Sequence, residues 1–174
     1  MSSVIIVRSF RERDNIMYQK GDKIVYPLYG AGVIEGLEEK ELDGALQTYY
    51  VWNIPVGNLK IMISATKAEA QKVRPVHSNE VLMASFAQAK VDNSNMPDNW
   101  TQRYKENMER IKSGDLPQVA LVFNSLLLRE RERGLSTAEK KMMTTAKQII
   151  LSELILSLDI EREEAEEILN DTFR

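Results

Sequence analysis

Residues 43–54 have the sequence DGALQTYYVWNI, a turn dipeptide followed by a run of aromatic and β-branched residues. Asp-Gly favours the two-residue turns of β-hairpins, because both turn positions need positive φ angles. Residues 48–54 have the composition of a strand, and residues 33–37, VIEGL, provide an apolar run before the turn. We therefore predict a β-hairpin at the centre of the N-terminal part of the chain.

Shorter runs on both sides of this hairpin predict further strands. Residues 23–26, KIVY, form one, and the two glycines of residues 30–32, GAG, are interpreted as a bend between strands. Residues 55–58, PVGN, predict a second turn, and residues 59–64, LKIMIS, alternate like a strand with one wetted face. Residues 72–75 can form the last strand of this set. About five short strands predict a small SH3-like or Tudor-like barrel.

The remaining sequence has helix-capping signals and helical spacing. Residues 92–97 form a polar break, Gly114 and Gly134 are stop signals, and residues 136–139, STAE, form a capping box. Helices are therefore predicted over residues 80–91, 97–113, 115–134 and 136–158, with Asp115 capping the third of them and Asp159 capping a last, acidic helix.

These patterns predict an α+β fold with two domains. The first is a small Tudor/SH3-like β-barrel over residues 17–75, and the second is a compact all-α domain of about five helices over residues 76–174. Residues 1–16 contain an apolar run that is too short for a signal peptide and continues into charged residues. We expect them to be a leader that is poorly ordered or not native.

The net charge of −3 is unevenly distributed along the chain. Residues 98–152 carry 10 basic and 7 acidic side chains, a net charge of +3, whereas residues 153–174 carry 2 basic and 8 acidic side chains, a net charge of −6. Electrostatic affinity for nucleic acid scales with the number of phosphates neutralised, so a patch of this size binds DNA weakly by itself. If the chain binds DNA, another contact should bring it there.

The sequence contains no convincing catalytic or metal site. It has no cysteine, which suits a reducing cytosol, and its single histidine, His77, is expected to be a solvated loop residue. The segment GAG lacks the Gly-Lys-Ser/Thr of a phosphate-binding loop, and the pairs Glu38-Glu39 and Glu163-Glu164 are expected to be solvated. No apolar run has the length needed to span a bilayer. We expect no enzyme activity, cofactor, metal, membrane contact or small-molecule ligand.

Trp100 is the first candidate for a binding role. It shares a helical stripe with Tyr104, Met108 and Ile111, which is typical of core packing, and by spacing alone burial and exposure are equally supported. Its position in the first turn of a helix favours the edge of a domain, where an apolar wedge among basic side chains can unstack a base step. The basic side chains that follow it are Arg103, Lys105, Arg110 and Lys112.

Lys140 and Lys141 are the second candidate, in the first turns of the helix that the capping box opens. Taken alone they are a solvated pair on a helix surface. Near Trp100 they would form a phosphate clamp.

Several motifs in the same order resemble the CarD/CdnL family of bacterial transcription regulators. Residues 20–27, KGDKIVYP, with residues 30–34, GAGVI, are similar to the opening of the family, and residues 99–107, NWTQRYKEN, match its signature around a tryptophan. Residues 113–115, SGD, and 131–142, RERGLSTAEKKM, match further on. The resemblance covers roughly residues 17–171.

The resemblance implies a Tudor-like domain that binds the RNA polymerase β subunit. It also implies a helical domain that contacts promoter DNA in the minor groove at the upstream edge of the transcription bubble, where a tryptophan wedge stabilises the open complex. Relatives often carry arginine at the positions of Lys40, Met62 and Gln102. The implied DNA-binding residues are Trp100, Arg103, Lys105, Met108, Lys140 and Lys141, and the implied polymerase-binding residues are Lys40, Leu42, Val51 and Met62.

Two other hypotheses belong to different functional classes. In the first, the chain is a protein–protein adaptor without direct DNA contact, and Trp100 is buried. In the second, it is a sequence-specific repressor, but no helix has the density of Arg, Asn and Gln that reads base edges. The family resemblance leads us to expect a monomer in the cytoplasm, associated with the nucleoid.

Overall fold

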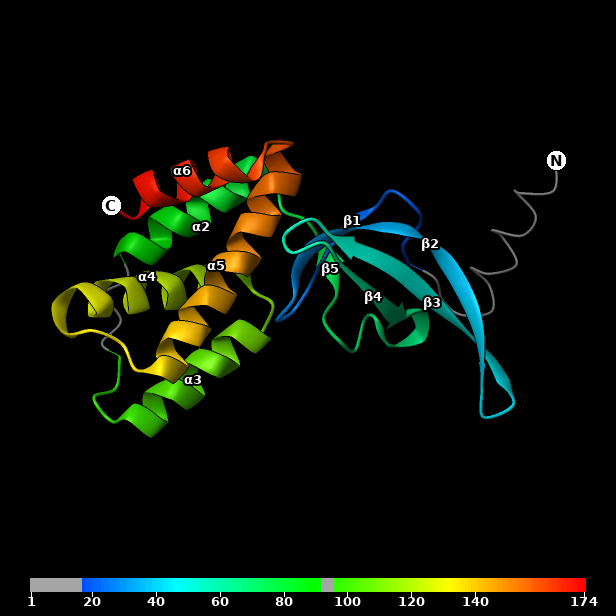
Figure 1. The fold of residues 1–174 in the computed structure, drawn as a ribbon, viewed down its shortest axis with the longest axis horizontal. Helices are drawn as coiled ribbons and strands as arrows, with labels where there is room; N and C mark the ends of the chain where they lie inside the picture. Colours follow the sequence, from blue (N-terminus) through cyan, green and yellow to red (C-terminus); the bar gives the residue numbers. More distant parts are fainter. Residues whose placement is uncertain (1–16, 92–95) are drawn as a thin grey trace.

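Five antiparallel strands precede five α-helices in the part of the chain that the computed structural model describes, residues 17–91 and 96–174 (Figure 1). The predicted leader, residues 1–16, and residues 92–95 of the predicted polar break lie outside the described residues. The predicted α+β class is confirmed, with a domain of strands followed by a domain of helices.

The strands form one sheet with the order β4-β3-β2-β1-β5. Asp43 and Gly44 connect β2 to β3 with φ angles of 53° and 78°, and Leu42 pairs with Ala45 across the turn. Both turn residues therefore have the positive φ values that the Asp-Gly dipeptide predicted. The strand bounds are β1 (Lys23–Tyr26), β2 (Gly30–Leu42), β3 (Ala45–Ile54), β4 (Leu59–Ser64) and β5 (Arg74–Pro75).

One face of the sheet forms the core of the N-terminal half. Tyr50, Trp52 and Ile54 alternate along β3 and are buried, together with Ile24 of β1 and Ile34 of β2. The short 3-10 helix η1 (Ala65–Lys67) follows β4 and contributes to the same cluster. The opposite, outer face of β3 is left half-exposed.

The helices build a second core. Leu116, Leu126, Ile150 and Leu154 are fully buried in it, on the two long central helices. The helix bounds are α2 (Asn79–Val91), α3 (Trp100–Lys112), α4 (Leu116–Arg133), α5 (Thr137–Leu158) and α6 (Arg162–Thr172). None of these helices is long and apolar enough to cross a membrane.

The ends of α4, α5 and α6 can be compared with the predicted capping signals. Gly134 ends α4, and Ser136 with Glu139 forms both bonds of the predicted capping box at the start of α5. The prediction for Asp159 was wrong, because Asp159 is the C-cap of α5 in the left-handed region, with φ 56° and ψ 47°, and α6 begins after Glu161. Aspartate tolerates the left-handed conformation, so the same residue type can end a helix as well as start one.

The two halves meet where α5 passes the β1–β2 turn (Figure 1). The amide of Ala31 donates to Ser152 Oγ at 2.7 Å, and a Cβ on Gly30 would lie 2.4 Å from that oxygen. The interpretation of Gly30 and Gly32 as a bend between strands was wrong, because both lie within β2 and pair with β1. Gly30 instead allows the close approach of α5. His77 is likewise not a solvated loop residue, since its Nδ1 lies 2.9 Å from a carboxylate oxygen of Glu153.

Candidate nucleic-acid interface

Trp100 is the first residue of α3, and 46% of its surface is exposed. Asn99 caps the helix by accepting a hydrogen bond from the amide of Gln102. The indole stacks on Tyr104, one turn along the helix, with ring centroids 5.5 Å apart and an interplanar angle of 21°. The side chain is therefore a surface group, whereas Ile111 at the other end of the same stripe is fully buried.

Ser136 connects Trp100 to the start of α5. Trp100 Nε1 donates to Ser136 Oγ over 3.3 Å, and that hydroxyl in turn donates to Glu139 Oε2 over 2.8 Å. Ser136 Oγ also accepts the backbone amide of Glu139 as part of the capping box. The cap thus has two roles, because it begins α5 and restricts the orientation of the exposed indole.

Arg103, three residues after Trp100 on α3, is buried, with 2% of its surface exposed. Its Nε donates to Glu139 Oε1 over 2.8 Å, and its Nη1 donates to the carbonyl oxygens of Pro97 and Asp98. In this position the guanidinium does not face solvent, so the geometry argues against the phosphate contact expected for Arg103. Its contacts join the segment before α3 to α5.

Glu139 has the complementary environment. Burial by itself would raise the pKa of this carboxyl, but hydrogen bonds from the backbone and hydroxyl of Ser136, and the bond to and charge of Arg103, lower the pKa below its ordinary value of 4.5. Arg129 of α4 lies 3.5 Å from the same carboxylate. An ionised Glu139 therefore holds α3, α4 and the cap of α5 together.

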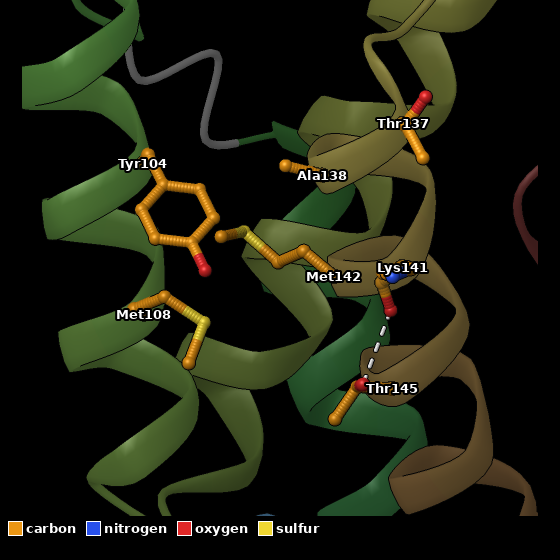
Figure 2. A pocket seen from close by; sticks show the side chains of 7 residues that line it. All are labelled: Tyr104, Met108, Thr137, Ala138, Lys141, Met142 and Thr145. Carbon is orange, nitrogen blue, oxygen red and sulfur yellow. Dashed lines mark hydrogen bonds between the residues drawn. The ribbon is translucent and has the colours of Figure 1, made fainter.

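A pocket of about 500 Å³ lies between α3 and α5 (Figure 2), and its lining residue Tyr104 is the one that stacks on Trp100. Tyr104 and Met108 of α3 face Met142 of α5 across it, and Lys141 lies on its α5 side. Met108 also packs against the helical core, so it is a partly buried floor residue. The complete lining is Tyr104, Met108, Thr137, Ala138, Lys141, Met142 and Thr145.

The three predicted lysines are exposed but differ in their surroundings. Lys141 lines the pocket, and Lys105 follows Tyr104 on α3. Lys140 lies 3.5 Å from Glu130 of α4, although most of its side chain is exposed. The structure therefore brings Trp100, Met108 and Lys141 to one surface, and it places Lys140 at the side of that surface.

The predicted polymerase-binding residues share the outer face of the sheet. Val51 of β3 pairs with Met62 of β4, and the register of β2 with β3 gives Lys40 and Leu42 the same orientation as Val51. Lys40 pairs with Gln47, which is four residues from Val51, or about 13 Å along the strand. The four residues thus lie on one face but in two groups.

The predictions from sequence missed Ser136 and Glu139 as supports of Trp100. Their capping-box pattern was visible, but a hydrogen bond between residues 36 positions apart has no local signal. The stacking on Tyr104 could have been found, because an aromatic pair at i and i+4 lies on one helix face.

Both halves of the chain are similar to known protein domains. Residues 18–77 match the model of the CarD-like/TRCF RID domain, and residues 84–170 match the CarD C-terminal domain. A Bacillus subtilis (strain 168) protein named "Putative transcription factor YdeB" is 39% identical over 141 residues, which cover 79% of this chain and 90% of that protein.

Proposed function

This chain belongs to the CarD family of transcription factors, and from that premise we propose that it stabilises the open promoter complex by two simultaneous contacts. Residues 17–75 bind the β subunit of RNA polymerase. Residues 76–174 bind promoter DNA in the minor groove at the upstream fork of the bubble, with Trp100 as the wedge. The proposal implies a place of action in the cytoplasm, on the nucleoid.

The observation that carries the DNA contact is the exposed, immobilised Trp100. An indole stacked on Tyr104 and hydrogen-bonded to Ser136 has lost most of its rotational freedom before DNA arrives. A wedge costs a few kcal/mol for each base step that it unstacks, and this cost is smallest where the duplex is already melting. Trp100 should therefore prefer a fork to an intact duplex.

Basic side chains next to the wedge support the same surface. Lys141 lies on the pocket beside Trp100, and Lys105 is exposed on the same helix as the indole. Both are placed to contact phosphates, which fix the position of a protein on the duplex without reading sequence. Met108 provides an apolar surface in the same pocket as Lys141.

The polymerase contact is supported by the outer face and free edge of the sheet. Among the described residues β4 pairs only with β3, so its other edge has unpaired backbone groups. Such an edge can accept a strand from a partner, and Val51, Met62, Lys40 and Leu42 provide side chains on the adjoining face. Binding there would supply the effective concentration that the weak basic patch lacks.

The test is the lifetime of the open complex with the Trp100→Ala chain. Stacking of a base on an aromatic side chain is worth about 1–3 kcal/mol, so its loss should shorten the lifetime at least several-fold while binding to a β-subunit fragment is unchanged. Trp100→Phe is the matched control and should retain part of the effect. A folded Trp100→Ala chain with the wild-type lifetime would contradict the proposed mechanism.

The adaptor hypothesis predicts a different result. It assumed a buried Trp100, and the 46% exposure of this residue removes that support. An adaptor would still bind the β-subunit fragment but would show no preference for forked DNA over duplex, which a fluorescence titration with the two DNAs distinguishes.

A further inference from the structure

Glu153 of α5 is a fully buried carboxylate at the junction between strands and helices. Both of its oxygens accept from Arg74 of β5, over 2.7 and 2.9 Å. The oxygen nearer to His77 also accepts that residue's backbone amide, over 3.0 Å. We call Arg74, His77 and Glu153 the interdomain clamp.

Arg74 and His77 of the clamp also form hydrogen bonds to other parts of the helical half. Arg74 Nε donates to the carbonyl oxygen of Gly114, in the turn between α3 and α4, over 2.9 Å. The carbonyl oxygen of His77 accepts from Ser157 Oγ over 2.7 Å. Residues of β5 and of the segment after it are therefore bonded to two separate helical elements.

A second contact between strands and helices is made by Ser152, the residue before Glu153 on α5. Ser152 Oγ accepts the amide of Ala31, and Gly30 leaves no room for a side chain against it. Gly114 lies close to the β1–β2 turn, because a Cβ there would lie 2.8 Å from Pro27 Cγ. Ser152 and Glu153 are neighbours on α5, and their partners lie in different strands, β2 and β5. The two contacts together therefore oppose rotation of α5 relative to the sheet as well as its separation from the sheet.

A buried ion pair is weak evidence for stability, because the cost of removing two charges from water offsets their attraction. A bidentate guanidinium–carboxylate pair does, however, require one geometry, which apolar packing does not. The arrangement is therefore better explained as a constraint on direction than as a source of stability.

The geometry points to a positioning role for Glu153. We propose that the interdomain clamp fixes the orientation of the polymerase-binding strands relative to Trp100, so that one chain reaches polymerase and the fork at the same time. This inference rests on the proposed function. Glu153 touches neither partner, and acts through the direction of α5.

The length of α5 shows why orientation matters. Glu139, which supports Trp100, and Glu153 are 14 residues apart on this helix, a separation of about 21 Å. A rotation of about 10° at the clamp would move the far end of such an arm by about 4 Å, which is close to one base step. Two bound sites increase affinity together only if the geometry lets both engage at once.

The orientation can be measured directly in the full chain. Because the sequence has no cysteine, Lys67→Cys in η1 and Lys112→Cys in α3 introduce two unique sites for spin labels, both exposed. Their distance distribution, measured by double electron–electron resonance, should be narrow in the wild-type background and broad with Glu153→Gln. Glu35→Gln, which removes the exposed pair with Lys60, is the control and should leave the distribution narrow.

A second experiment measures binding and open-complex lifetime with the same substitutions in chains without spin labels. Glu153→Gln should bind a β-subunit fragment and forked DNA separately as the wild type does, yet should lose the extension of open-complex lifetime. If Glu153→Gln does not fold, Arg74→Met combined with Glu153→Met removes both charges together and avoids an unpaired buried charge.

The outcomes separate the two proposals. A narrow wild-type-like distribution in the clamp variants, or a broad one with an unchanged lifetime, would overturn the positioning role. If the wild-type chain itself does not extend the lifetime, the proposed function fails, and the clamp is then judged on the distance distributions alone.

Discussion

Trp100 and Trp52, the two tryptophans of the chain, occupy opposite environments. Trp52 is fully buried in the core of the N-terminal half, whereas nearly half of Trp100 is exposed. Truncation of a buried tryptophan leaves a cavity and costs about 3–5 kcal/mol, but substitution of an exposed residue costs about 1 kcal/mol or less. The same substitution at the two positions therefore separates a core role from a surface role.

We predict that Trp100→Ala lowers the free energy of unfolding by about 1 kcal/mol or less, and Trp52→Ala by about 3–5 kcal/mol. Urea unfolding measures both. Iodide quenching gives an independent check in a Trp52→Phe chain, where Trp100 should be quenched readily. A loss of several kcal/mol with Trp100→Ala would mean that the residue belongs to the core and that the wedge assignment is wrong.

Glu139 gives a prediction for the dependence of stability on pH. Its pKa is lowered in the folded chain, so its contribution is fully present above the unfolded value of about 4.5 and is lost as the pH falls through the lowered folded value. Glu139→Gln should remove this part of the decline below pH 4.5. Unfolding free energies of both chains between pH 3 and pH 7 provide the measurement, and parallel curves would contradict the assignment.

At the scale of elements, the N-terminal end of α5 carries the capping box, Lys140 and Lys141 within its first two turns. Each phosphate contact that is lost should reduce the slope of log affinity against log salt by about 0.9. Lys141 should account for the larger share, because Lys140 lies close to Glu130 whereas Lys141 lines the pocket.

Lys140→Glu combined with Lys141→Glu should therefore weaken binding to forked DNA and flatten its salt dependence by up to about 2 units of slope. Fluorescence anisotropy at several salt concentrations measures both quantities. Lys67→Glu with Lys90→Glu makes the same change in net charge at exposed positions of η1 and α2, and should leave the slope unchanged. Equal effects of the two pairs would mean that overall charge, not this helix end, determines binding.

Elements were predictable where their signals are local. The Asp43-Gly44 turn and the Ser136 cap each depend on residues within three positions, and both formed as predicted. His77 and Arg103 were not predictable in the same way, because their partners Glu153 and Glu139 lie 76 and 36 positions away. A charged residue close to an exposed tryptophan in sequence can be buried in an ion pair or can contact DNA. Sequence spacing does not distinguish these two roles.

At the scale of the whole molecule, the distribution of charge limits how tightly the chain can bind DNA by itself. The basic segment, residues 98–152, has a net charge of only +3, and the acidic residues that follow it reduce the general attraction to DNA. In the proposed function, affinity for the fork then depends on the local concentration that polymerase binding provides. The two contacts should therefore fail in different ways when each is weakened.

Met62 of β4 tests this division, because it is half-exposed on the outer sheet face opposite Val51. Met62→Asp should weaken β-subunit binding without unfolding the chain, and its effect on the open complex should return as the chain concentration is raised, since mass action replaces lost affinity. Trp100→Ala should not recover at any concentration, because the bound chain lacks the stacking group. Titrating both variants against open-complex lifetime measures the difference. Recovery of Trp100→Ala to the wild-type plateau would contradict the wedge, and a Met62→Asp curve identical to that of the wild type would place the polymerase contact elsewhere on the chain.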